Sequence, residues 1–278
     1  MKHFRTLAAV IVASFITVAG TARVIDHVNP FVGTTNFGTT NPGAICPNGL
    51  MSVTPFNVMG SDLNVYDKDS RWWSTPYCYE NKFFTGFSHV NLSGVGCPEL
   101  GLVLTMPTTG KVQPDHCIHG SEYTAEHAEP GYYSCDLTGY GIKVEASATT
   151  RTSAERYTFP EGRSNILVNL GEGLTNESGG WIRKVSDTEI EGMRLAGTFC
   201  YNPQAVFPMY FAIRISRKPA ESGFWKLQPK MKGVEAEWTP DNGTYKIYSK
   251  YGREIAGDRI GYWFSFDTEA GEQVELQM

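Results

Sequence analysis

The sequence predicts a mostly β protein, organised as one large antiparallel β-sandwich. Short segments with the residue pattern of strands follow one another, and turn signals such as Pro130-Gly131 and Asp241-Asn242-Gly243 separate them. The 278 residues include 29 Gly and 15 Pro, and 13% are aromatic, a composition that favours short strands and tight turns over helical bundles. Helical periodicity is scarce beyond residue 22.

Residues 1–22 predict a secretory signal peptide and stand apart from the fold. Lys2 and Arg5 give a basic start, an apolar run covers residues 7–18, and Gly20-Thr21-Ala22 supplies small residues for cleavage. This run is too short for a stable membrane anchor, and no longer apolar run follows. We therefore expect an exported protein, periplasmic or extracellular, whose residues 23–278 form the sandwich without membrane insertion.

The charge balance argues against a nucleic-acid partner. The whole chain has 24 basic and 29 acidic residues, and loss of Lys2 and Arg5 with the signal leaves 22 against 29, a net charge of −7. Such a chain has no basic run with which to neutralise phosphates.

Two kinds of pattern predict the individual strands. Ile142, Val144, Ala146 and Ala148 alternate with polar neighbours, which is typical of a half-buried strand. The apolar run over residues 100–106 predicts a buried strand that ends at Pro107. Further strands are predicted at 157–159, 164–170, 181–185, 188–198, 207–216, 233–238, 244–251 and 262–267. The alternation over 273–278 continues to the last residue, from which we expect a truncated product or a gene fragment.

Aromatic side chains gather between residues 62 and 81, where Trp72, Trp73, Tyr77 and Tyr79 are close in sequence. A pyranose ring has an apolar face of C–H groups that packs on such rings, so this cluster is a candidate sugar platform. Packing within the core is the alternative. His89 could hydrogen bond with a sugar hydroxyl, or with the backbone of its own segment.

The titratable residues predict neither a metal site nor a catalytic pair. Asp115-His116-Cys117-Ile118-His119 has ligand types at close spacing, but a structural zinc site needs four converging ligands and no second half is apparent. Cleavage of a glycosidic bond needs two carboxyl groups in different protonation states. No local pattern singles out a pair among Glu99, Glu122, Glu126, Glu172 and Asp187. Glu172 is the best placed, after an apolar strand, and a turn role is favoured for it.

Six cysteines are present, and an exported chain permits disulfides between them. Six cysteines allow 15 pairings, among which the sequence does not choose. Because their spacings show no regular pattern, buried thiols are favoured over disulfides.

Several motifs occur in a fixed order along the chain. They begin with Val28-Asn29-Pro30-Phe31-Val32-Gly33-Thr34, and residues 86–97 then have the sequence G-F-S-H-V-N-L-S-G-V-G-C. Shorter pieces are Pro42-Gly43-Ala44, Pro47-Asn48-Gly49-Leu50, Met106-Pro107, Glu129-Pro130-Gly131-Tyr132-Tyr133, and residues 149–160. Together they resemble glycoside hydrolase family 92, the calcium-dependent exo-α-mannosidases, over nearly all of residues 23–278. The G-F-S-H segment is the most specific of them.

The resemblance implies a complete enzyme of two parts. An N-terminal β-sandwich packs against a C-terminal α/α-barrel, which carries the general acid, the general base and most calcium ligands of an inverting reaction. This chain is similar to the sandwich alone, so the barrel is expected to be absent from it. We expect no catalytic residue, metal ligand or cofactor within it, and calcium only in the complete enzyme.

The resemblance also implies that the loop 33–43 and the region 72–89 face the sugar cleft. The implied substrate-binding residues are Phe37, Thr39, Trp72, Trp73, Tyr77 and His89. Thr39 stands where the family often has a histidine, a departure that bears on the sugar contacts and on the preferred linkage.

These observations predict the N-terminal domain of an exo-acting α-mannosidase, which shapes the substrate cleft, docks the catalytic barrel and is inactive alone. Its expected partners are mannose-containing glycans and the barrel. A free-standing carbohydrate-binding module is one alternative and would need a complete site within this chain. A structural or assembly subunit is the other, and would show an exposed apolar face without a response to sugar.

Overall fold

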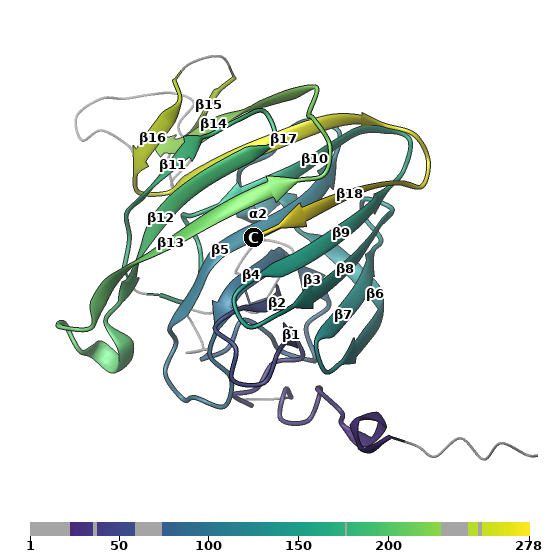
Figure 1. Ribbon diagram of the computed structural model, residues 1–278, viewed down its shortest axis with the longest axis vertical. Helices are drawn as coiled ribbons and strands as arrows, with labels where there is room; N and C mark the ends of the chain where they lie inside the picture. Colours follow the sequence, from purple (N-terminus) through teal and green to yellow (C-terminus); the bar gives the residue numbers. More distant parts are fainter. Residues whose placement is uncertain (1–22, 36–37, 59–73, 176, 229–243, 250–251) are drawn as a thin grey trace, which may run out of the picture.

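The computed structural model describes residues 23–35, 38–58, 74–175, 177–228, 244–249 and 252–278, and its strands form two large antiparallel sheets (Figure 1). The helical elements of this part are single turns, namely η1 (Val24–His27), α2 (His116–His119) and η2 (Phe199–Tyr201). None of the described helices has the length and apolar character that crossing a bilayer requires. The predicted mostly β sandwich is confirmed.

The eight-stranded sheet has long central strands and short edge strands. Its order is β1 (Ala44–Ile45), β2 (Ser52–Phe56), β4 (Gly86–Asn91), β5 (Leu100–Thr109), β10 (Gly162–Asn169), β17 (Ile260–Thr268), β14 (Glu221–Gln228) and β15 (Thr244–Tyr248). Strand β10 pairs with β5 on one side and with β17 on the other. These three strands are buried along almost their whole length, as expected for the centre of a sheet that is covered on both faces.

The ten-stranded sheet contains the strands of alternating pattern. Its order is β16 (Glu254–Gly257), β11 (Gly180–Lys184), β12 (Glu189–Gly197), β13 (Val206–Ile215), β18 (Glu272–Gln277), β9 (Ser153–Phe159), β8 (Ile142–Ala148), β7 (Tyr132–Leu137), β6 (Ser121–Glu129) and β3 (Phe83–Phe84). Buried and exposed positions alternate along β8, β9 and β12, so one face of this sheet lies on the core and the other faces outward. The last strand, β18, lies between β13 and β9, in yellow in Figure 1.

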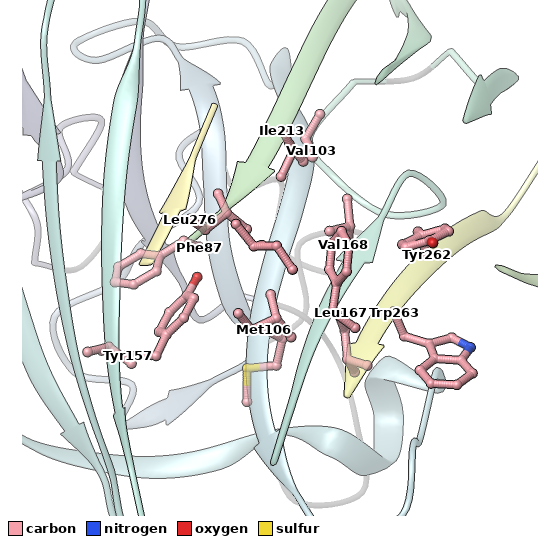
Figure 2. Packing of buried hydrophobic residues seen from close by; sticks show 14 of the residues in the cluster. Phe87, Val103, Met106, Tyr157, Leu167, Val168, Ile213, Tyr262, Trp263 and Leu276 are labelled. Atoms are coloured by element: carbon pink, nitrogen blue, oxygen red, sulfur yellow. The ribbon is translucent and has the colours of Figure 1, made fainter. Parts of the chain in front are cut away.

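The core lies between the two sheets. Figure 2 shows Tyr157, Ile213 and Leu276 of the ten-stranded sheet beside Val103 and Met106 of β5. Each of these side chains is almost completely buried, which is the main source of stability in such a sandwich.

One position in the eight-stranded sheet requires glycine, because an aromatic side chain lies directly against its backbone. A Cβ atom added to Gly261 on β17 would lie 2.0 Å from the Trp225 ring of β14, the strand paired with it. Only glycine lets the fully buried indole of Trp225 lie against the backbone here.

Most strands of the second half lie where the sequence places them. Strand β8 has the predicted bounds, and β9 to β13, β15, β17 and β18 overlap their predicted segments. The strand at 100–106 was predicted too short, because β5 continues through Pro107, which is paired with Ile166 of β10. Pro107 lies beyond the last residue of β5 that is paired with β4. The N–H that proline lacks is therefore not needed for pairing with β4. The predicted strand 233–238 lies outside the described residues.

Candidate functional site

The described residues of the loop 33–43 are held by hydrogen bonds from two other parts of the chain and by one bond to the preceding residue, Val32. The N–H of Gly94 donates to the carbonyl of Thr39 at 2.7 Å, and the N–H of Tyr79 donates to the carbonyl of Thr34 at 3.0 Å. The Thr40 hydroxyl donates to the carbonyl of Val32 at 2.7 Å. These bonds place the half-buried Thr39 between the start of the loop and the segment that follows β4.

Asn41 fixes the second half of the same loop. Its Nδ2 donates to the carbonyl of Leu92 at 3.2 Å, and its Oδ1 accepts from the Thr54 hydroxyl at 3.0 Å and from the N–H of Gly43 at 3.3 Å. One side chain thus joins the loop to β2 and to the segment after β4. The polar contacts thus hold the described residues of the loop in one arrangement.

A groove of about 570 Å³ lies beside the first residues of the loop and is lined by Asn29, Phe31, Thr35, Tyr79, Lys82, Tyr123, Thr124, Ala125 and Glu126. Its apolar wall is formed by Phe31 and Tyr79, whose ring centroids are 5.8 Å apart. The Tyr79 side chain is 43% exposed. An accessible ring of this kind can pack against the C–H face of a sugar.

The polar wall of the groove is built around Glu126. Its Oε1 accepts hydrogen bonds from the hydroxyls of Tyr77 at 2.7 Å and Tyr133 at 2.8 Å, while its Oε2 accepts from Lys82 Nζ at 3.1 Å. Lys82 Nζ also lies 4.2 Å from the centroid of the Tyr79 ring. The groove therefore combines an exposed ring with a charged donor and acceptor, the set of contacts that a hydroxylated ring can use.

The predicted substrate-binding residues fall into three groups. Thr39 lies in the anchored loop, as described above. Phe37, Trp72 and Trp73 lie outside the described residues. Tyr77 and His89 are completely buried, so in this arrangement neither side chain can contact a sugar at the surface.

Tyr77 fixes the position of Glu126 in the wall of the groove. Burial raises the pKa of its hydroxyl far above the usual value, and the neighbouring Tyr123 and the Glu126 carboxylate add to the rise. The hydroxyl is thus neutral and donates to Glu126, which fixes the position of that carboxylate.

His89 belongs to a buried network between the two sheets. Its Nδ1 lies 2.8 Å from the carbonyl of Val103, and its Nε2 lies 2.7 Å from Oε1 of Glu155 on β9. Glu155 Oε2 accepts from the hydroxyls of Thr105, at 2.5 Å, and Tyr157. These contacts satisfy the polar atoms of a strand that runs through the core.

Four of the five carboxylates considered from the sequence, those of Glu99, Glu126, Glu172 and Asp187, have partners within the described residues. Asp187 lies 2.9 Å from Lys184 Nζ and 2.8 Å from Lys218 Nζ, and these charges lower the pKa of the Asp187 carboxyl to about 2. Oε1 of the buried Glu99 accepts from the backbone N–H groups of Leu100 at 2.9 Å and Gly197 at 3.2 Å.

Arg194 on β12 is a buried cation that binds the eight-stranded sheet. Its Nη1 donates to the carbonyl of Leu102 at 2.8 Å and to the carbonyl of Glu172. Burial lowers the pKa of Arg194 to about 10, against the opposite influence of the Glu172 and Glu99 carboxylates.

A disulfide joins Cys97, in the segment after β4, to Cys200 in η2. The favoured prediction that the cysteines stay as thiols is wrong for this pair. The two are separated by 103 residues, so no local spacing marks them, and the fold brings their Cα atoms to 5.5 Å. The other four cysteines, Cys46, Cys78, Cys117 and Cys135, are outside any disulfide.

The calcium implied by the resemblance does not fit the described part of the chain. Ca²⁺ takes six to eight oxygen ligands. Within the described ranges, the one group of three or more potential ligands is Asp115, His116 and Cys117, which includes a nitrogen and a sulfur. We therefore assign no step of chemistry to calcium here.

No local pattern in the sequence marks the groove. Phe31 stands in a recognised motif and Tyr79 in the aromatic cluster, but nothing local marks Lys82 or Glu126 as their neighbours. The pairing of β3 with β6 brings the segments of Lys82 and Glu126 together.

Comparison with known proteins identifies relatives over nearly the whole chain. Residues 27–278 match the family described as glycosyl hydrolase family 92 N-terminal domain. A family GH92 alpha-mannosidase from Bacteroides thetaiotaomicron has a similar structure, with a TM-score of 0.73 and 27% identity over 91% of this chain. The same enzyme has been solved in complex with mannoimidazole, with a TM-score of 0.73 and 28% identity.

Two further relatives agree. A family GH92 inverting mannosidase from Bacteroides thetaiotaomicron VPI-5482 has the same fold, with a TM-score of 0.67 at 21% identity over 92% of this chain. An uncharacterized secreted glycosidase from Arthroderma benhamiae (strain ATCC MYA-4681 / CBS 112371) is 27% identical in an alignment of 166 positions that covers 53% of this chain. This chain covers 32% of each mannosidase chain and 20% of the fungal glycosidase.

Proposed function

The chain belongs to the glycosyl hydrolase family 92 N-terminal domain family, and on that premise we propose that it is the N-terminal domain of an exo-acting α-mannosidase. In this proposal the sandwich shapes the substrate cleft and docks a C-terminal catalytic barrel. The barrel supplies the general acid, the general base and the calcium site of an inverting reaction. The protein is exported, and its substrates are mannose-containing glycans.

The anchored loop 33–43 carries this proposal. Its backbone is bonded to Gly94 and Tyr79, and Asn41 adds a second bond to the segment after β4 and one to β2. A loop that closes a sugar cleft needs such preorganisation, because ordering it on binding would reduce the affinity. Thr39 is at the centre of these contacts and is the residue of the described loop that we assign to substrate binding.

An exposed apolar area near the start of β13 supports the docking role. Val206 and Tyr210 lie on the same face of β13, four residues apart, and both are exposed, Tyr210 to 67%. Exposed apolar side chains grouped in this way are typical of an interface with another domain. We assign the α/α-barrel as the partner of this area.

The chain alone is expected to be inactive. Glycoside hydrolysis needs one acid and one base or nucleophile on opposite sides of the scissile bond. In the described part, Glu99 and Glu155 are buried, Glu126 is bound by two tyrosines and a lysine, and Asp187 is paired with two lysines. These carboxylates have structural roles.

The test has two parts. The purified chain should release no mannose from an α-mannoside, and measurable turnover that copurifies with the chain would contradict the proposal. A chimera should then be made, in which residues 27–278 replace the matching part of the Bacteroides thetaiotaomicron mannosidase. It should hydrolyse the α-mannoside, and Asn41→Ala should lower kcat/KM by about tenfold, because loss of the loop's anchors costs about 1.4 kcal/mol. Equal kcat/KM for the two chimeras would contradict the role of the loop.

The groove beside Tyr79 favours a second candidate function, binding of carbohydrate by this chain alone. Isothermal titration calorimetry with mannose and mannobiose tests it. A dissociation constant below about 1 mM, or roughly −4 kcal/mol, that is lost in Tyr79→Ala would support a binding module. Tyr210→Ala is the matched control, since it removes an exposed tyrosine on a different strand. Weaker binding, or equal effects of the two substitutions, would reject this candidate.

A further inference from the structure

Asp115, His116 and Cys117 bring three kinds of metal ligand together at the start of α2. One potential ligand atom from each residue lies within 4.8 Å of the other two. Asp115 caps the helical turn by accepting from the N–H of Cys117 at 3.0 Å, so the turn itself fixes the spacing of these side chains. All three residues are half-buried.

The distance between nitrogen and sulfur suits a tetrahedral metal ion. Cys117 Sγ lies 3.4 Å from His116 Nε2. Zinc bonds of about 2.05 Å to nitrogen and 2.3 Å to sulfur, at a tetrahedral angle, separate the two atoms by about 3.6 Å. A hydrogen bond also fits this distance, and the two arrangements differ in whether a proton or a metal ion lies between the atoms.

Glu172 supplies the contact that the local sequence lacks. Its Oε1 lies 3.5 Å from His116 Nδ1, the ring nitrogen on the side away from Cys117. The backbone of Glu172 is held in turn by Arg194. Histidines that bind metals through one nitrogen commonly donate the other N–H to a carboxylate, which fixes the ring and the tautomer.

Nearby carboxyl groups favour a cation at this site, and a groove gives solvent access to it. Two carboxyl groups, those of Asp115 and Glu172, lie beside the His116 ring. A groove of about 430 Å³ runs along Asp115 and Tyr245 and opens to solvent. His119 is not part of the set, because it is buried and its Nδ1 is bonded to the carbonyl of Gln113 at 2.9 Å.

We propose that Asp115, His116 and Cys117 bind one zinc ion through a carboxylate oxygen, Nε2 and Sγ. Glu172 orients His116 through Nδ1, and the groove reaches the site at Asp115. Sulfur and imidazole ligands select zinc over calcium or magnesium, which prefer oxygen alone. On binding, the Cys117 thiol gives up its proton and the Zn–S bond forms without any redox change.

The experiment is a Zn²⁺ titration of the purified chain after dialysis against a chelator. One ion should bind per chain with a dissociation constant of roughly 1 µM or lower. Cys117→Ser should weaken binding at least 100-fold, whereas Cys46→Ser, which removes another half-buried thiol, should leave it unchanged. Glu172→Gln keeps the three ligands and should weaken binding by about 10- to 100-fold.

Cobalt gives a readout that does not depend on affinity alone. Co²⁺ in the same site should show a thiolate-to-cobalt charge-transfer band, present in Cys46→Ser and absent in Cys117→Ser, with far-ultraviolet circular dichroism confirming that both variants are folded. The proposal is overturned if no stoichiometric zinc binds, if the band is missing, or if Cys46→Ser and Cys117→Ser behave alike. It is also overturned if Glu172→Gln binds zinc as tightly as the unmodified chain.

Discussion

His89 Nε2 on β4 lies 2.7 Å from Glu155 Oε1 on β9, and neither side chain is exposed to solvent. The contact joins the eight-stranded sheet to the ten-stranded one through polar atoms inside an otherwise apolar core. Since a carbonyl can only accept, the Nδ1 that faces the carbonyl of Val103 carries a hydrogen, and Nε2 then shares one proton with Glu155. The two sheets are thereby held in one alignment.

Removal of one partner of this pair should be strongly destabilising. In His89→Leu, the Glu155 carboxylate stays buried without its partner, and the free energy of unfolding should fall by about 3–5 kcal/mol. Urea denaturation followed by circular dichroism measures the change. Glu275→Gln is the control, because it breaks the exposed pair with Arg156 and should cost about 1 kcal/mol or less. Similar losses in both variants would show that the buried pair contributes no more than a surface pair.

His119 should make stability depend on pH in the mildly acidic range. Burial lowers the pKa of its imidazole from 6.5 to about 4 in the folded chain. The unfolded chain therefore binds the proton more readily between these values. Stability is fully present above about pH 6.5 and is lost as pH falls towards 4, by up to roughly 3 kcal/mol.

His119→Gln should flatten this part of the pH profile while the exposed His127→Gln leaves it unchanged. The measurement is urea denaturation at pH 4, 5, 6 and 7, with a chelator present to exclude any effect of metal at the neighbouring His116. A profile that is equally steep in His119→Gln and in the unmodified chain would contradict the assignment.

The Cys97–Cys200 disulfide should stabilise the chain by restricting its unfolded state. It closes a loop of about 100 residues, for which chain entropy sets an upper value of about 4.7 kcal/mol, while disulfides typically contribute about 2–4 kcal/mol. Cys200→Ser should lower the free energy of unfolding by that amount. Thiol titration under denaturing conditions should find four thiols before reduction, matching Cys46, Cys78, Cys117 and Cys135, and six afterwards. Six thiols before reduction would show that the bond does not form.

The fold could be predicted where burial alternates along the strand. Strand β8 has one buried residue at every second position, and its predicted bounds, 142–148, are those of the structure. Strand β4 was missed, because Ser88 and His89 interrupt its apolar pattern although every residue in it is buried. Polar atoms in such a strand are satisfied by partners distant in sequence, which no local pattern reveals.

The candidate site could be predicted only in part, for the same reason. The motif around Gly33 and Pro42 marks the loop, but the sequence does not distinguish an aromatic ring on a surface from one in a core. The buried hydroxyl of Tyr77 is satisfied by Glu126, which is 49 residues away in the sequence. The buried ring of His89 is satisfied by Glu155, which is 66 residues away. The groove, the disulfide and the contact of Glu172 with His116 likewise depend on long-range pairing.

Arg194 should be the most sensitive position on β12, because its guanidinium serves two carbonyls of other segments. In Arg194→Ala, the carbonyls of Leu102 and Glu172 lose their donor inside the protein, and the free energy of unfolding should fall by about 2–4 kcal/mol. Arg214→Ala on β13 is the matched control, since this arginine is exposed and only contacts Glu189 at 3.3 Å, so its loss should cost about 1 kcal/mol or less.

Arg194→Lys separates the role of the charge from that of the fork-shaped guanidinium. A lysine keeps the positive charge near Glu99 and Glu172, but its side chain is shorter, so its ammonium falls short of the position from which Nη1 donates to both carbonyls. The loss for Arg194→Lys should therefore lie close to that for Arg194→Ala, measured by the same urea denaturation. If lysine restored full stability, its ammonium would replace Nη1, and the guanidinium group would not be required at this position.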